Sequence, residues 1–429
     1  MSMLPGPAPA VQEPPVYRPF ALIALAATLL VGTPLGTWML ARPHWGGGPV
    51  PVEHAWLHAH LQIFGFFGTL IVGVAHHLVP RFAGRPVAAT PLTRWLAGAF
   101  GAALALRIAG TAVRTAGPMV VAALLQALAF GLFGAWVARA LSAPHLRLTR
   151  AHLTAATAWL VAALVLEAGL RAGGASGADL APGPAAGGMR AVHAMAVYGG
   201  VVGWIVGVVL RAGPMLVPRW RVPGAVARMA PGALGLGVVL AGVGLAGPWS
   251  GATRVALERA GEALALGTVM AVALSGGAFR CASGALPMLA RGGPETRLFR
   301  MAMLAAAVAA AGSAGAAVLA WTAVPLSLLA DALRHLVTVG FLTSMVVGMA
   351  FRLIPVVEGV ALPWPGLRGV ALWALLVAVL LRTAEALADY GFEAILQLVP
   401  LSGVLVWVAL ACLGAGFLGT VIRRRGAPL

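Results

Sequence analysis

Apolar runs of about 20 residues recur along the whole chain, and short segments that hold most of the charged residues separate them. A helix that crosses a bilayer needs about 20 predominantly apolar residues. About twelve runs meet this length, centred near residues 30, 67, 103, 130, 162, 204, 238, 270, 310, 344, 378 and 408. The first run is too long for the core of a signal peptide, so we expect it to be kept as the first span. The pattern predicts an all-α integral membrane protein of about twelve transmembrane helices.

Composition agrees with this class and excludes others. Only 10% of the 429 residues are charged, against about 25% in soluble domains. Hydrophobic residues make up 60% of the chain, which excludes a disordered chain. Cys281 and Cys412 lie in or beside apolar runs, so we expect neither a disulfide framework nor a thiolate metal site.

The net charge of +17 comes from arginine, because all 29 basic residues are Arg. These arginines fall mainly in the loops that follow even-numbered spans, for example Arg423 to Arg425 after the twelfth. The positive-inside rule therefore places those loops and both termini in the cytoplasm of a bacterial-type inner membrane. Because the excess is spread over loops, we expect the lipid bilayer, and no nucleic acid, as a partner. We expect a Pro-rich cytoplasmic N-terminus over residues 1–18 and one membrane domain over 19–429.

The second, sixth and tenth spans share a pattern of small residues. The second and tenth read His60-x4-Gly65-x7-Gly73-x6-Pro80 and His335-x4-Gly340-x7-Gly348-x6-Pro355. The sixth keeps the Gly and Pro spacing in Gly199, Gly207 and Pro214, with His193 displaced by one residue. Small residues at regular places suit close helix packing in lipid. The repeat predicts three units of four helices, at about 19–145, 150–285 and 298–422.

Histidines gather at one depth of the predicted bundle. His58, His60, His193 and His335 all lie near the extracytoplasmic ends of their spans. Ionisable residues within spans usually mark a functional interior, and neutral imidazole commonly ligates haem iron and copper. We therefore expect a cofactor site there, with histidines bonded to neighbouring carbonyls as the alternative. Arg334, next to His335, is a candidate partner of haem propionates, or else an arginine that extends to the membrane surface.

Other polar residues in the spans stay open to more than one interpretation. His76 and His77 are expected to form a polar helix end that faces the cytosol, rather than a second site or a proton entry. Glu167 and Glu262 are either proton-relay carboxylates or buried partners of Arg107. The chain has no Walker loop, no dinucleotide fingerprint after a strand and no HExxH motif, so hydrolase and nucleotide-driven functions have no residues to support them.

The second span resembles a helix of known respiratory enzymes. Its sequence, Leu57-His58-Ala59-His60-Leu61-Gln62-Ile63-Phe64 and on to His76-His77-Leu78-Val79-Pro80-Arg81, is similar to helix two of haem–copper oxidase catalytic subunits. C-type cytochrome oxidases and nitric oxide reductases are the most similar. The resemblance implies that His58 and His335 match ligands of the low-spin haem, and that His193 falls near a copper ligand. Leu333 stands where those enzymes have the histidine of the high-spin haem, and span seven lacks their His-His pair.

This reduced ligand set resembles the NnrS family of twelve-span proteins, which are associated with haem, copper and nitric oxide metabolism. The His58-Ala59-His60 opening and the stretch from His335 to Arg352 resemble motifs of that family, whereas Pro355 to Gly359 departs from its usual ending. The resemblance implies one b-type haem held by His58 and His335, with His60 as the alternative ligand. His193 becomes a candidate copper or distal haem ligand.

Three functions follow from these observations. The first is an NnrS-type haem protein of nitric oxide or respiratory redox metabolism, with or without oxidoreductase activity of the oxidase type. Its small ligand would be a gas such as nitric oxide, and its redox partner is unknown. The second is a cofactor-free transporter, which inverted repeats and broken helices would support. The third is a maturation factor that carries haem or copper to an oxidase.

Overall fold

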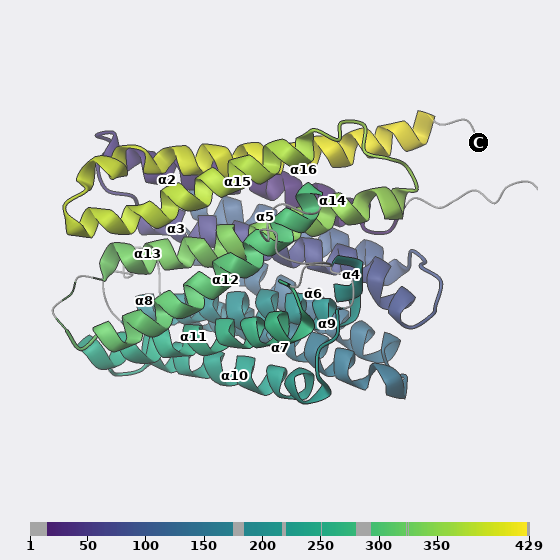
Figure 1. The fold of residues 1–429 in the computed structure, drawn as a ribbon, viewed down its shortest axis with the longest axis horizontal. Coiled ribbons are helices and arrows are strands. Elements are labelled where there is room, and N and C mark those ends of the chain that lie inside the picture. Colours follow the sequence, from purple (N-terminus) through teal and green to yellow (C-terminus); the bar gives the residue numbers. More distant parts are fainter. Residues whose placement is uncertain are drawn as a thin grey trace, which may run out of the picture.

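The computed structural model describes residues 15–174, 184–216, 220–249, 251–279, 293–322, 324 and 326–426. All regular structure in these ranges is helical, and the long helices lie side by side as a bundle (Figure 1). The predicted all-helical class is confirmed. The elements are α1 (Arg18–Ala26), η1 (Ala27–Gly32), α2 (Thr33–His44), α3 (Val52–His60), η2 (Leu61–Gly68), α4 (Thr69–Phe82), α5 (Pro91–Ala112), α6 (Ala116–Ala140), η3 (Pro144–Leu146), α7 (Arg147–Ala172), α8 (Pro184–Ala194), η5 (Met195–Val202), α9 (Gly203–Leu216), α10 (Gly224–Ala246), α11 (Gly251–Gly276), α12 (Pro294–Leu319), α13 (Ser327–His335), η6 (Leu336–Thr343), α14 (Ser344–Glu358), α15 (Leu367–Ala384), η7 (Glu385–Tyr390), η8 (Glu393–Gln397) and α16 (Val399–Gly426).

Within the described ranges, eleven helices are long and apolar enough to cross a membrane. Eleven of the twelve predicted spans correspond to them. The eighth predicted span forms α11, a helix of 26 residues that lacks a sufficiently apolar stretch. Its first half carries Arg254, Glu258, Arg259 and Glu262. Three of these charges pair with one another: Arg259 lies 3.1 Å from Glu258 and 2.6 Å from Glu262.

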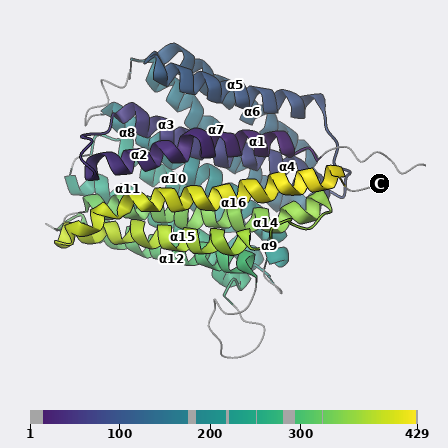
Figure 2. The same cartoon turned by 90° about the horizontal axis from the view of Figure 1, so that it is seen from above.

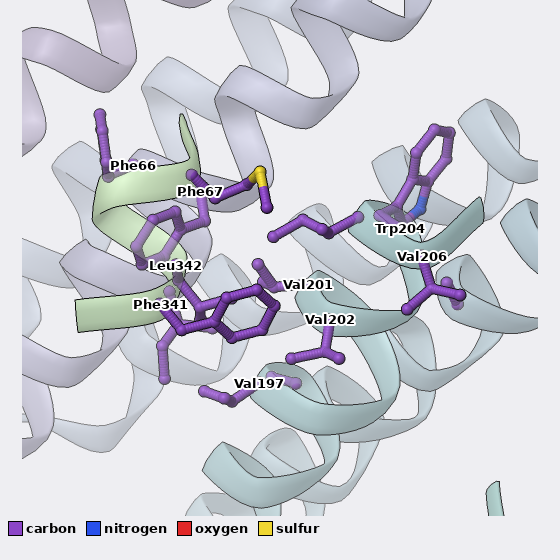
Figure 3. Packing of buried hydrophobic residues seen from close by; sticks show 14 of the residues in the cluster. Phe66, Phe67, Val197, Val201, Val202, Trp204, Val206, Phe341 and Leu342 are labelled. Carbon is purple, nitrogen blue, oxygen red and sulfur yellow. The ribbon is translucent and has the colours of Figure 1, made fainter. Parts of the chain in front are cut away.

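The three repeat-related spans form the inside of the bundle. In Val52–Phe82 and Ala186–Pro214, 78% and 83% of the most apolar 18 residues are buried, and the value for Ser327–Glu358 is 61%. The other eight candidate spans reach only 39–50%, as expected of helices that face lipid on one side. Figure 3 shows side chains of these inner helices, among them Phe67, Val201 and Phe341, gathered between them.

Each inner span contains a π-helical segment of eight residues, η2, η5 and η6. The segments begin one residue after His60, two after His193 and one after His335. The displacement of His193 in the sequence repeat therefore places it one residue earlier than its counterparts, about 100° around the helix. π-Helical turns are rare and often occur at functional sites.

The repeated glycines permit close contacts between helices, as the sequence predicts. A Cβ atom on the second glycine of each motif would come within 2.6, 2.6 and 3.0 Å of a side chain on the span that precedes it. The pairs are Gly73 with Phe20, Gly207 with Leu153, and Gly348 with Leu298. Such distances leave no room for a side chain. The same contact between adjacent spans thus recurs in all three units.

A buried carboxylate holds the two ends of the described chain together. Glu358, at the end of α14, accepts hydrogen bonds from Tyr17 at 2.7 Å and Arg424 at 3.1 Å, and also pairs with Arg18. Figure 2 shows the end of α16 beside α14. Burial and the Glu358 carboxylate raise the pKa of Tyr17, so its phenol stays protonated and donates.

Candidate functional site

His58 lies near the N-terminal end of its span, with one ring nitrogen fixed. Its Nδ1 lies 2.8 Å from the carbonyl oxygen of Gly32, so Nδ1–H must donate. A Cβ atom on Gly36 would collide with the imidazole ring, so glycine at this position makes room for His58. Among the described residues, Nε2 has no hydrogen-bond partner, and its lone pair is available.

His335 has two neighbours at the same nitrogen. Nδ1 lies 3.0 Å from the carbonyl oxygen of Asp331 and 2.7 Å from Nη2 of Arg382. It can serve only one of them, because a carbonyl only accepts and a guanidinium only donates. With the proton on Nδ1, His335 donates to Asp331 and leaves Nε2 as an acceptor. With the proton on Nε2, it accepts from Arg382, and no ring lone pair is left.

The carboxylates around Arg382 hold this guanidinium independently of His335. Arg382 forms ion pairs with Asp331 and, at 2.7 Å, with Glu385. Its side chain is only 2% exposed. Arg382 and Asp331 also act electrostatically on His58. His58 and His335 therefore belong to one polar region between the first, second, tenth and eleventh spans.

His60 lies in a different buried network, and both of its nitrogens are used. Nδ1 accepts from Nη2 of Arg107 at 3.0 Å, and Nε2 then donates to Oε1 of Gln126 at 2.8 Å. Glu167 lies 2.6 Å from Arg107 and 3.0 Å from Arg171. Glu167 is thus a buried partner of Arg107, which was one of the two alternatives.

The two networks share a His–Arg pair with the same spacing along the chain, which the sequence analysis missed. Arg107 follows His60 by 47 residues, and Arg382 follows His335 by the same 47 residues. Ala194 takes the corresponding place in the sixth span, and the residue 47 positions later is Ala241. Extending the repeat comparison to the next span would have found Arg382, because its spacing matches that of Arg107.

In the described part of the chain, no hydrogen bond joins the side chain of His193 or Arg334 to His58 or His335. The ring of His193 packs 5.3 Å from that of Trp56, within electrostatic range of His60, Glu167, Arg107 and Arg334. Arg334 pairs with Asp331 at 2.7 Å, and its side chain is 58% exposed. The described part of the chain contains no group of three or more His, Cys, Asp or Glu that could hold a metal ion. Copper at His193 stays a prediction.

The expectation of a solvated helix end at His76 and His77 is wrong. The two side chains are 3% and 6% exposed and lie within α4. Nδ1 of His76 donates to the carbonyl oxygen of Val72 at 2.8 Å, and its ring stacks on Trp136 with 4.4 Å between centroids. The buried part of α4 continues to Val79, so these histidines face protein.

Comparison with known proteins identifies the fold of the chain but no sequence family. No protein-family model matches the chain, and no curated protein matches its sequence. Among solved structures, the chain is similar to a haem–copper terminal oxidase, a dimer determined by cryo-EM. The TM-score is 0.70 at 12% identity, over 97% of this chain and 85% of that one. The protein is therefore a multi-pass membrane protein with the haem–copper oxidase-like fold.

Proposed function

We propose that the protein is a haem-binding membrane protein of the NnrS type, which acts in nitric oxide or respiratory redox metabolism. Nε2 of His58 and Nε2 of His335 hold one b-type haem between the second and tenth spans. In the predicted orientation, this site lies near the extracytoplasmic face. The oxidase-like fold supports the proposal. The observation that carries it is the hydrogen-bond geometry of the two imidazoles.

His58 and His335 share one hydrogen-bond geometry at Nδ1. Each has Nδ1 within hydrogen-bond distance of a backbone carbonyl, at 2.8 and 3.0 Å. Histidines that ligate a metal commonly donate the other ring N–H to such a group, which fixes the ring and its tautomer. The donor set therefore fits haem iron, which Nε2 of His58 and Nε2 of His335 would hold.

His60 fits this role less well. Its Nδ1 accepts from Arg107 and its Nε2 faces Gln126, so iron would have to displace a buried hydrogen bond. Such a bond is costly to leave unmade. The choice between His58 and His60, which the sequence repeat leaves open, thus favours His58.

Two arginines, Arg334 and Arg382, supply positive charge beside His335. Arg334 is partly exposed and keeps guanidinium donors beyond its bond to Asp331, which suits propionate groups at the membrane surface. Arg382 also has Asp331 and Glu385 as partners, so His335 can give up its contact with Arg382 and donate to the Asp331 carbonyl instead. When bound, the haem would supply a redox-active iron, with a place for nitric oxide if one imidazole is released.

The test is the cofactor content of the full chain purified in detergent after expression with sufficient haem. We expect a b-type band in the reduced-minus-oxidised spectrum, about one extractable haem per chain, and loss of that band in His58→Ala and His335→Ala. His60→Gln and the exposed-site control His145→Ala should keep it, with copper quantified in the same samples. A folded protein without haem, or loss of haem in His60→Gln alone, contradicts the proposal.

A further inference from the structure

A pocket lies in the other half of the bundle, away from His58 and His335. It has a volume of about 130 Å³ and is lined by residues of α1, η2, α4, α9, α14 and α16. Its walls are almost entirely apolar and include the aromatic residues Phe66, Phe67, Phe82, Trp204 and Phe417. Figure 3 shows Phe66, Phe67 and Trp204 on the inner helices that contribute to it.

His77 is the one imidazole in this wall. Its side chain is 6% exposed, and neither Nδ1 nor Nε2 has a hydrogen-bond partner in the described part of the chain. An imidazole buried without partners costs free energy, and each such group in a folded protein needs an explanation. Neutral imidazole offers one donor and one acceptor, both unused here.

The neighbouring polar group does not satisfy His77. Tyr17 lies beside it, with 6.4 Å between ring centroids in an edge-to-face arrangement. Its hydroxyl, however, donates to Glu358 at 2.7 Å. Water is a poor occupant, because a buried water typically makes about three hydrogen bonds, and an apolar cavity of about 150 Å³ stays dry and accepts benzene.

We propose that this pocket binds an oxygenated six-membered ring, such as a phenol or the headgroup of a quinone. The ring would pack against the aromatic walls, which favour offset or edge-to-face contact. Its oxygen would bond to His77, either by donating a hydroxyl proton to the imidazole or by accepting the imidazole N–H. The site is separate from the haem site and does not depend on haem.

The test uses 4-fluorophenol as probe, followed by ¹⁹F NMR titration of the full chain in detergent. We expect saturable binding that weakens about tenfold in His77→Leu and is retained in His77→Gln, which restores a hydrogen-bonding group. Fluorobenzene, which lacks the oxygen, should bind the natural protein and His77→Leu equally. Ala350→Phe fills the pocket and should abolish binding of both probes, whereas His145→Leu, an exposed histidine, should change neither.

Competition then identifies the source of the ring. Displacement of 4-fluorophenol by duroquinone assigns the site to quinone headgroups, and phenol binding without displacement assigns it to free phenolic molecules. The proposal is overturned if neither molecule binds saturably, or if folded His77→Leu binds 4-fluorophenol as tightly as the natural protein does. Retention of the haem band in every variant separates this result from the haem proposal.

Discussion

Nη2 of Arg382 lies 2.7 Å from Nδ1 of His335, at the start of a π-helical segment on an inner span. The same pair recurs between Arg107 and His60 at 3.0 Å. The two copies differ at the far nitrogen: Nε2 of His60 faces Gln126 at 2.8 Å, whereas Nε2 of His335 has only a long 3.5 Å approach from Arg382. One copy of the repeat is thus a closed polar network, whereas the other leaves a lone pair on Nε2 only when Nδ1 carries the proton and donates to the Asp331 carbonyl.

We expect the stability of the protein to depend strongly on the charge balance of the closed network around His60. Arg107→Met removes the 2.6 Å partner of Glu167 and leaves a carboxylate with too little compensation. Breaking a buried pair from one side costs about 3–5 kcal/mol. We expect a clear fall in Tm, measured by scanning fluorimetry in detergent, and partial recovery in Arg107→Met/Glu167→Gln. A double variant less stable than Arg107→Met would contradict this coupling.

A substitution at Gly36 tests the role of His58 in haem binding without removing the imidazole. In Gly36→Ala, the added methyl group would collide with the imidazole and turn it away from the Gly32 carbonyl. We expect less haem per purified chain, measured by extraction, with the helix content unchanged. Gly131→Ala is the matched control because a Cβ there meets nothing within 4 Å. An equal haem content in the two variants would remove His58 from the ligand set.

The sequence was sufficient for eleven of the twelve predicted spans and for the close packing of the repeat, because both depend on local composition. Apolar length predicts the helices, and the glycine spacing predicts which spans approach closely. The partners of His60 lie 47, 66 and 107 residues away along the chain, so no local pattern joins them. Two adjacent histidines are polar and therefore suggest a helix end, whereas the burial of His76 depends on Phe20 and Trp136 and that of His77 on Tyr17, all of which lie outside the second span.

The repeated glycine contacts can be tested at one position. Gly73→Ala would put a Cβ 2.6 Å from the Cβ of Phe20, and overpacking of this kind costs about 1–3 kcal/mol. We expect a lower Tm in detergent for Gly73→Ala. Gly98→Ala, where a Cβ has open space, should leave the Tm equal or slightly higher because alanine favours helix. Equal Tm values for Gly73→Ala and the natural protein would show that the helices can separate there without cost.

The predicted orientation can be tested with two arginines in opposite loops. Arg114 follows the third span and Arg85 follows the second, and both side chains are exposed. If even-numbered loops are cytoplasmic, a membrane-impermeant maleimide added to intact spheroplasts should label Arg114→Cys and not Arg85→Cys. Permeabilised cells should show labelling of both, which controls for accessibility. Labelling of Arg85→Cys alone would reverse the orientation, place His58 and His335 on the cytoplasmic side, and change which redox partners can reach the proposed haem.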